Sequence, residues 1–189
     1  IQYMDQCGYD FVIMIKGMGS FVRELILEKR GSFENIREYN IRKYKVSGTT
    51  VKKMLYAGDE KERYFHIYYS DQKASAGHEQ IEAKIDRMAK YLDKVKGKKV
   101  IIGEGFKQYF HLEMDRTFLY AREKADAVQQ EINLCGYFVI ITSKKMTAGE
   151  ALELYKSRDA SEKLFRGTSP ILGIRACGCS QTKRQAQKS

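Results

Sequence analysis

Two short apolar runs constrain the fold of this chain more than any other feature. GYDFVIMIKG occupies residues 8–17, and GYFVIITS occupies residues 136–143. Each run is introduced by Cys-Gly, has the length of a strand and is rich in β-branched and aromatic residues. Near-continuous apolarity of this kind is typical of central strands that are covered on both faces. Both runs therefore predict buried strands of one core, although residues 18–135 separate them.

The intervening sequence has a different texture. MGSFVRELILEKRG and HEQIEAKIDRMAKYLDKVKG each predict an amphipathic helix, because their apolar residues recur at helical spacing. In the second of these segments the spaced residues are Ile81, Ile85, Met88, Leu92 and Val95. Three further stretches, REYNIRKYKV, TTVKKMLYAG and RYFHIYYS, are basic, aromatic and partly alternating, which predicts strands separated by polar turns.

These patterns together predict an α/β fold with three parts. A core is formed by residues 1–17 and 136–167, and a basic α+β insertion over residues 18–135 interrupts it. Residues 168–189 keep no helical or strand period and are rich in Gln, Lys and Ser at their end, which predicts an irregular tail.

The formal charge of +10 favours a polyanionic partner, with DNA the first candidate. No apolar run approaches the roughly 20 residues that span a bilayer. We therefore expect no membrane partner and a cytoplasmic location. The four cysteines form no disulfide framework for a chain of this size, and the scattered histidines do not complete a zinc site with the C-x-C pair.

A helix is predicted after the second apolar run, and its buried face is unusual. Thr147 followed by Glu150 is a capping-box pattern. Ala148, Ala151, Leu152, Tyr155 and Phe165 then fall on one side of the helix. Arg158 and Glu162 fall on that same side, where an unpaired charge is expensive to bury. Spacing alone also fits a weak Arg–Glu pair on the helix surface with the tyrosine packed alongside.

The wider context resembles a known family. GYFVIITSKKMTAGEALELYKSRDASEKLFRG is similar to the C-terminal catalytic region of DDE-type transposases of bacterial insertion sequences. The matching group has the signature Tyr, two residues, Arg, three residues, Glu, six residues, Lys. Tyr155, Arg158 and Glu162 match it in identity and spacing. IQYMDQCGYDFVIMIKG also resembles the helix and strand that follow the second catalytic Asp in that group.

The resemblance implies a partial ribonuclease H-like core. Glu162 would be the third catalytic carboxylate and a ligand of Mg²⁺ or Mn²⁺, which activates water and then a DNA 3′-hydroxyl. Tyr155 and Arg158 would bind DNA phosphates beside the metals. The implied partners are the ends of the insertion sequence and its target DNA, with a homodimer in the full-length protein.

The chain also departs from this family. The first two catalytic carboxylates are expected upstream of these residues, and neither Asp5 nor Asp10 is assigned to either role. Asp159 stands where relatives often have Trp, and it is expected at most at the edge of the site. Ser169 stands at the signature Lys.

The sequence after Gly167 suggests a reason for the last departure. Relatives continue F-R-G-D-K-S-Y-L-G-N-K-S-L-R. Deleting one base from codons chosen for that run reproduces Gly167–Gly178 of this chain. We therefore hypothesise a truncated chain whose residues from Thr168 onward are a frameshifted ending.

The sequence is compatible with three functions. The first is a transposase fragment that is inactive alone, because two catalytic carboxylates are missing. The second is a non-catalytic DNA-binding module that uses basic aromatic strands, since these suit phosphate contact and base stacking. Its candidate residues are Arg42, Lys43, Tyr44, Lys45, Lys52 and Lys53. The third is an unrelated Mg²⁺ nuclease, for which the sequence identifies no further carboxylates near Glu162.

Overall fold

The computed structural model describes residues 4, 7–15, 17, 19–55, 58–59 and 61–158 of the chain. Its elements, in chain order, are β1 (Val12–Met14), α2 (Ser20–Lys29), η1 (Arg37–Tyr39), β2 (Asn40–Ile41), η2 (Arg42–Tyr44), β3 (Val46–Met54), β4 (Glu62–Tyr69), α3 (Asp71–Val95), α4 (Glu104–Lys107), β5 (Phe110–Met114), β6 (Phe118–Glu123), α5 (Ala125–Asn133) and β7 (Tyr137–Thr142). Residues 148–158 are also helical and are called the 148–158 helix below.

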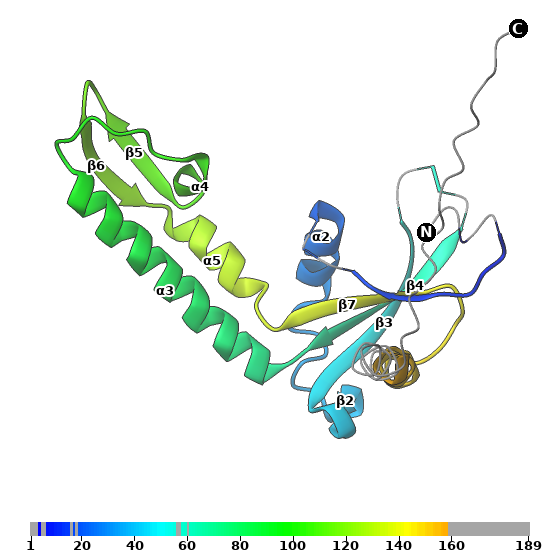
Figure 1. Cartoon of the computed structure of the whole chain (residues 1–189). Helices are drawn as coiled ribbons and strands as arrows, with labels where there is room; N and C mark the ends of the chain where they lie inside the picture. The colour runs from blue at the N-terminus through cyan, green and yellow to red at the C-terminus, as the bar shows by residue number, and fades with distance from the viewer. Residues whose placement is uncertain are drawn as a thin grey trace, which may run out of the picture.

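Five of the described strands form one antiparallel sheet in the order β1–β7–β4–β3–β2 (Figure 1). β7 lies between two neighbours, and Val139, Ile140 and Ile141 are buried, so the prediction of a central strand is confirmed there. The same prediction is wrong for β1. Within the described residues β1 pairs only with β7, and its residues stay half-buried because its other edge has no neighbouring strand.

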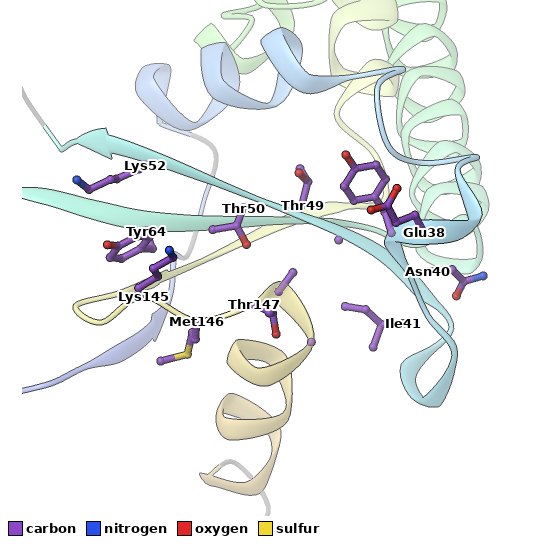
Figure 2. Close-up of a pocket in the computed structure, with 14 residues that line it drawn as sticks. Glu38, Asn40, Ile41, Thr49, Thr50, Lys52, Tyr64, Lys145, Met146 and Thr147 are labelled. Atoms are coloured by element: carbon purple, nitrogen blue, oxygen red, sulfur yellow. The ribbon is translucent and has the colours of Figure 1, made fainter.

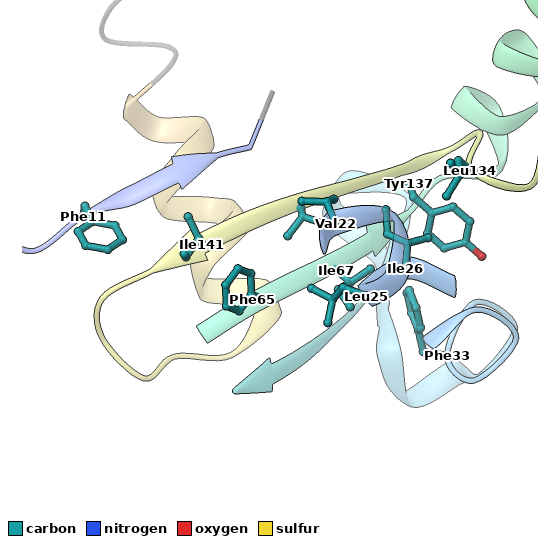
Figure 3. Close-up of a cluster of buried hydrophobic side chains, with 11 residues drawn as sticks. Phe11, Val22, Leu25, Ile26, Phe33, Phe65, Ile67, Leu134, Tyr137 and Ile141 are labelled. Atoms are coloured by element: carbon teal, nitrogen blue, oxygen red, sulfur yellow. The ribbon is translucent and has the colours of Figure 1, made fainter. Parts of the chain in front are cut away.

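Helices cover both faces of this sheet. Successive side chains of a strand point to opposite faces, so Phe65 and Ile67 of β4 meet α2, whereas Tyr68 meets the 148–158 helix. Figure 3 shows the larger of these two cores, between α2 and the sheet. Its buried residues are Phe11, Val22, Leu25, Ile26, Phe33, Phe65, Ile67, Leu134, Tyr137, Val139 and Ile141.

Residues 71–134 form a second body, called the arm below, which extends away from the sheet (Figure 1). The remaining described residues are called the sheet unit. In the arm, α3 and α5 pack together and carry the β5–β6 hairpin and α4 at the far end. The apolar residues predicted at helical spacing on α3, Ile81 through Val95, all belong to the core of the arm, which confirms that prediction.

The arm joins the sheet at two adjacent points. The amide of Ser70, at the end of β4, donates a 3.1 Å hydrogen bond to the carbonyl of Gly136, just before β7. Gly136 has φ +85°, and a Cβ there would lie 2.7 Å from Ala74 Cβ and 2.8 Å from the Ser70 carbonyl oxygen. Only glycine fits this position, because the left-handed conformation and the close backbone approach both exclude a side chain.

The predicted insertion contributes to both bodies. Its part before residue 71 supplies α2, β2, β3 and β4, and β4 pairs directly with β7. The sheet therefore crosses the predicted boundaries at residues 18 and 135. The mixed α/β content predicted from the sequence is confirmed, and the sheet is antiparallel throughout its described strands.

One predicted strand is wrong. REYNIRKYKV forms the 3-10 turns η1 and η2 on either side of the two-residue strand β2. Lys45, which ends η2, has φ +52°, and this left-handed residue turns the chain sharply into β3. The other two basic stretches form β3 and β4 as predicted. Among the described residues, no helix combines the length and the apolar character that crossing a membrane requires.

Candidate nucleic-acid interface

The start of the 148–158 helix has the capping geometry that the sequence predicts. The Thr147 amide donates a 2.7 Å hydrogen bond to Glu150 Oε2, and the Glu150 amide donates a 3.2 Å hydrogen bond to Thr147 Oγ1. These reciprocal bonds satisfy two backbone donors that a helix start otherwise leaves without partners. The hydrogen bonds from Thr147 lower the pKa of Glu150.

The buried stripe of this helix ends where the sheet ends. Ala151 and Leu152 are completely covered, and Tyr155 is half-buried against the same core. Arg158 is exposed, and its Nη1 donates a 3.2 Å hydrogen bond to the carbonyl oxygen of Val12 on β1. Arg158 thus lies on the predicted side of the helix, which faces β1, but its side chain is exposed and not buried because the helix has reached the edge strand by that residue.

Two of the three predicted motif residues are thus located. Tyr155 and Arg158 lie on successive turns of one helix and face the edge of the sheet at β1. Glu162, the predicted catalytic and metal-binding carboxylate, lies outside the described residues. The same holds for Asp159, for Ser169 and for the predicted tail over residues 168–189.

The β1–β7 pair brings together the two segments that resemble the transposase family. Val12 is opposite Thr142, and Met14 is opposite Ile140. Beyond the paired residues, the Phe11 amide donates a 3.0 Å hydrogen bond to Ser143 Oγ. Chain segments that are far apart in the sequence therefore form one continuous surface beside the 148–158 helix.

Asp10 lies at this same end of the sheet but is engaged by a cation. Lys144 Nζ lies 2.5 Å from Asp10 Oδ2, and Ser143 Oγ donates a 3.3 Å hydrogen bond to Oδ1. The hydrogen bond from Lys144 holds the pKa of Asp10 below its usual value. Among the described residues no group of three His, Cys, Asp or Glu side chains is arranged to hold a metal. Glu162, the predicted ligand, lies outside the described residues, so the expected Mg²⁺ or Mn²⁺ stays a prediction.

Most of the basic side chains in the basic aromatic segments form ion pairs within the protein. Lys52 pairs with Glu62 on the neighbouring strand, Lys53 pairs with Glu28 of α2, and Lys43 pairs with Glu153 of the 148–158 helix. Exposed pairs of this kind contribute little to stability, but they lower the local positive potential. These three lysines are therefore less suited to phosphates than their number suggests.

The net charge is unevenly divided between the two bodies. Residues 1–70 and 135–158 hold 16 basic and 11 acidic side chains, whereas residues 71–134 hold 12 and 11. The positive excess therefore belongs to the sheet unit and to residues 159–189, not to the arm. A polyanion is attracted to the sheet unit first.

A polar chain that the sequence did not reveal joins three strands of the sheet, with His66 and Thr142 buried and Thr50 exposed. Thr142 Oγ1 donates a 2.8 Å hydrogen bond to the Lys144 carbonyl, so it must accept the 2.9 Å bond from His66 Nε2. His66 Nδ1 then accepts the 2.8 Å bond from the Thr50 hydroxyl. Burial lowers the pKa of His66 to about 4, which fixes the neutral ring. Only the strand alternation of RYFHIYYS hinted that His66 faces the same side as Tyr64 and Tyr68.

No protein-family model, curated protein or solved structure gives a significant match to this chain.

Proposed function

We propose that this chain carries part of the catalytic region of a DDE-type transposase, with a ribonuclease H-like core, and that it binds DNA through the face formed by β1 and the 148–158 helix. A cytoplasmic location, where bacterial DNA is accessible, belongs to this proposal. The sheet unit carries the basic excess that such a partner requires.

The meeting of β1, β7 and the 148–158 helix is the observation that carries the proposal. The two stretches that resemble the family lie at opposite ends of the described sequence, yet their strands pair directly. The helix that carries the Tyr-Arg part of the signature returns across the sheet to the backbone of Val12. A catalytic site needs its contributing segments side by side, and this arrangement meets that requirement.

Tyr155 and Arg158 are proposed to bind phosphates, the first through its hydroxyl and the second through its exposed guanidinium. The hydrogen bond from Arg158 Nη1 to the Val12 carbonyl holds the planar guanidinium at the sheet edge. Glu162 remains the proposed catalytic carboxylate. We derive no metal-dependent step, because the described residues supply no fitting ligand set.

A salt titration of DNA binding tests the proposal. Fluorescence anisotropy with a short labelled duplex would be measured between about 50 and 200 mM salt for the parent, Arg158→Ala and Arg87→Ala. Arg87 lies on α3 of the arm and is the matched control. We expect Arg158→Ala to lower the affinity about tenfold and to reduce the salt slope by about one unit, whereas Arg87→Ala changes neither.

Equal effects of the two substitutions would contradict the proposed interface, and no salt-dependent binding by the parent would contradict DNA binding altogether. Circular dichroism of Arg158→Ala separates a lost phosphate contact from a lost fold. The alternative, a non-catalytic module that binds through the basic aromatic strands, predicts instead that Lys43→Ala and Lys53→Ala weaken binding more than Arg158→Ala does. The ion pairs of Lys43 and Lys53 disfavour that outcome.

A further inference from the structure

A cavity of about 690 Å³ opens on the sheet face that the 148–158 helix covers (Figure 2). It lies between the β2–β3 corner, the exposed ends of β3 and β4, and the loop that leads into the helix. Its lining residues include Ile41, Gly48, Thr50, Lys52, Lys145 and Met146. Its volume lies within the range that small-molecule sites occupy.

The close packing of the helix start on the sheet creates this space. The Tyr68 hydroxyl donates a 2.7 Å hydrogen bond to the Ala148 carbonyl and so fixes the first turn above β3. Gly48 permits that approach, since a Cβ there would lie 2.8 Å from Tyr68 Cδ1 and 3.1 Å from Ala148 Cβ. The neighbouring walls, Ile41 and Met146, are apolar, which suits the faces of an aromatic ring.

The floor of the cavity offers a defined hydrogen-bond acceptor. The Thr50 hydroxyl proton is committed to His66 Nδ1, because His66 Nε2 donates to Thr142 on its other side. The exposed Thr50 oxygen therefore presents lone pairs, and not a proton, to whatever enters. A ring that carries an amino group satisfies this acceptor, whereas a carbonyl at the same place meets repulsion.

One end of the cavity is basic. Figure 2 shows Lys52, Tyr64 and Lys145 gathered at the end opposite Glu38 and Asn40. Lys52 is paired with Glu62, and the neighbouring Lys144 is paired with Asp10 outside the cavity. Lys145 is exposed, and no ion pair joins it to another residue in the described ranges. The capping box engages the Thr147 and Glu150 amides, and Lys145 is the cationic side chain that the cavity offers to an anion.

We propose that this cavity binds a nucleotide, with an amino-bearing base at Thr50 and its phosphate at Lys145. The proposal does not rest on the transposase assignment or on the β1 interface. A free nucleotide and a single nucleotide of a DNA strand share this chemistry, and the experiment below separates the two sources.

Isothermal titration calorimetry with four probes tests the proposal. The probes are deoxyadenosine monophosphate, thymidine monophosphate, inorganic phosphate and a short single-stranded oligodeoxyadenylate. We expect the adenine nucleotide to bind about tenfold more tightly than the thymine nucleotide, because adenine offers Thr50 an amino group, whereas the ring N–H of thymine is flanked by two carbonyls. Inorganic phosphate alone should bind more weakly than either. Tighter binding of the oligonucleotide than of the monophosphate would identify the strand as the source, and the reverse order would identify the free nucleotide.

Adjacent lysines provide the matched pair of variants. Lys145→Glu should weaken binding of the adenine probe at least about tenfold, whereas Lys144→Glu, which has the same charge change outside the cavity, should change it less than about twofold. Thr50→Val should remove the preference for adenine over thymine and keep binding of both. Both lysines are exposed, so these variants keep the fold, which circular dichroism checks for all three.

Equal losses in the two lysine variants, or no binding of any probe by the parent, would overturn the nucleotide site. Neither result bears on duplex binding at β1, which the Arg158 titration measures separately.

Discussion

The sheet unit and the arm are held together by different kinds of contact. Every residue of the arm core lies between residues 81 and 132, and the helices α3 and α5 run side by side. The core of the sheet unit instead joins Phe11 and Val22 to Ile141, across the whole length of the arm. The arm therefore depends on local periodicity, and the sheet unit depends on register between distant strands. Charge divides in the same way, because the arm is nearly neutral and the sheet unit is basic.

The largest expected effect comes from the joint between the two bodies. Gly136→Ala places a Cβ 2.7 Å from Ala74 Cβ in a left-handed conformation, so it combines a clash with backbone strain. We expect a loss of about 3 kcal/mol in the free energy of unfolding, measured by urea denaturation. Gly97→Ala is the control, since Gly97 has φ +74° with open space around it and should lose about 1 kcal/mol from strain alone. Similar losses at the two glycines would show that the joint is not tightly packed.

Lowering the pH should reduce the stability of the sheet unit before that of the arm. Burial lowers the pKa of His66 to about 4, whereas an unfolded histidine titrates near 6.5. The unfolded state therefore binds the proton first, and stability falls as the pH drops from about 6.5 toward 4, by up to about 3 kcal/mol. Hydrogen exchange across this pH range should show the loss in β3, β4 and β7.

His66→Leu should be less stable at neutral pH, because Thr50 and Thr142 lose their partner. The carboxylates still titrate in this variant, so the difference between its profile and that of the parent isolates His66. Parallel pH profiles for the two proteins would contradict the buried neutral ring.

The two bodies also differ in how their main helices begin. Thr147 and Glu150 bond reciprocally at the start of the 148–158 helix, whereas Ser70 only accepts a long 3.4 Å bond from the Lys73 amide at the start of α3. Thr147→Ala should therefore cost about 1 kcal/mol and Ser70→Ala about 0.5 kcal/mol in thermal unfolding. A larger cost at Ser70 would mean that the arm helix depends on its cap more than its geometry indicates.

The smallest expected effect follows from removing the arm. Tyr69 and Tyr137 are direct partners in the β4–β7 ladder, so a two-residue Asn-Gly turn can replace residues 70–136 and close a hairpin. We expect the shortened chain to keep the near-ultraviolet circular dichroism of the sheet tyrosines and to bind duplex DNA within about twofold of the parent. Loss of DNA binding in a folded shortened chain would place the interface on the arm instead.

The same division explains what the sequence could predict. The periodicity of Ile81 to Val95 was sufficient for the arm helix, because a single helical face decides it. The capping of Thr147 by Glu150 was equally local. The prediction for REYNIRKYKV was wrong, because its alternating residues fit a strand. The turn at Lys45 gives no signal in the sequence, since its left-handed residue is a lysine and not a glycine. The edge position of β1 depends on pairing order, which no local pattern encodes.

The candidate sites divide along the same line. The spacing of Tyr155 and Arg158 is local, so the sequence alone was enough to predict it. Their approach to β1 depends on the tertiary structure and could not be predicted. The polar chain through Thr50, His66 and Thr142 joins three strands, and nothing in the spacing of those residues indicates it. The cavity above Thr50 was unpredictable for the same reason.

The hydrogen bond between Ser70 and Gly136 has a consequence for the order of folding. β4 and β7 are separated by residues 70–136, and closing a flexible loop of that length costs about 3 kcal/mol more than closing a two-residue turn. The arm has a core of its own, so we expect it to fold from its own contacts and then to hold the ends of the two strands together. The central pair of the sheet then forms as if it were a local hairpin. The arm thus serves as a template for the β4–β7 register, and an arm that folds slowly would delay the whole sheet.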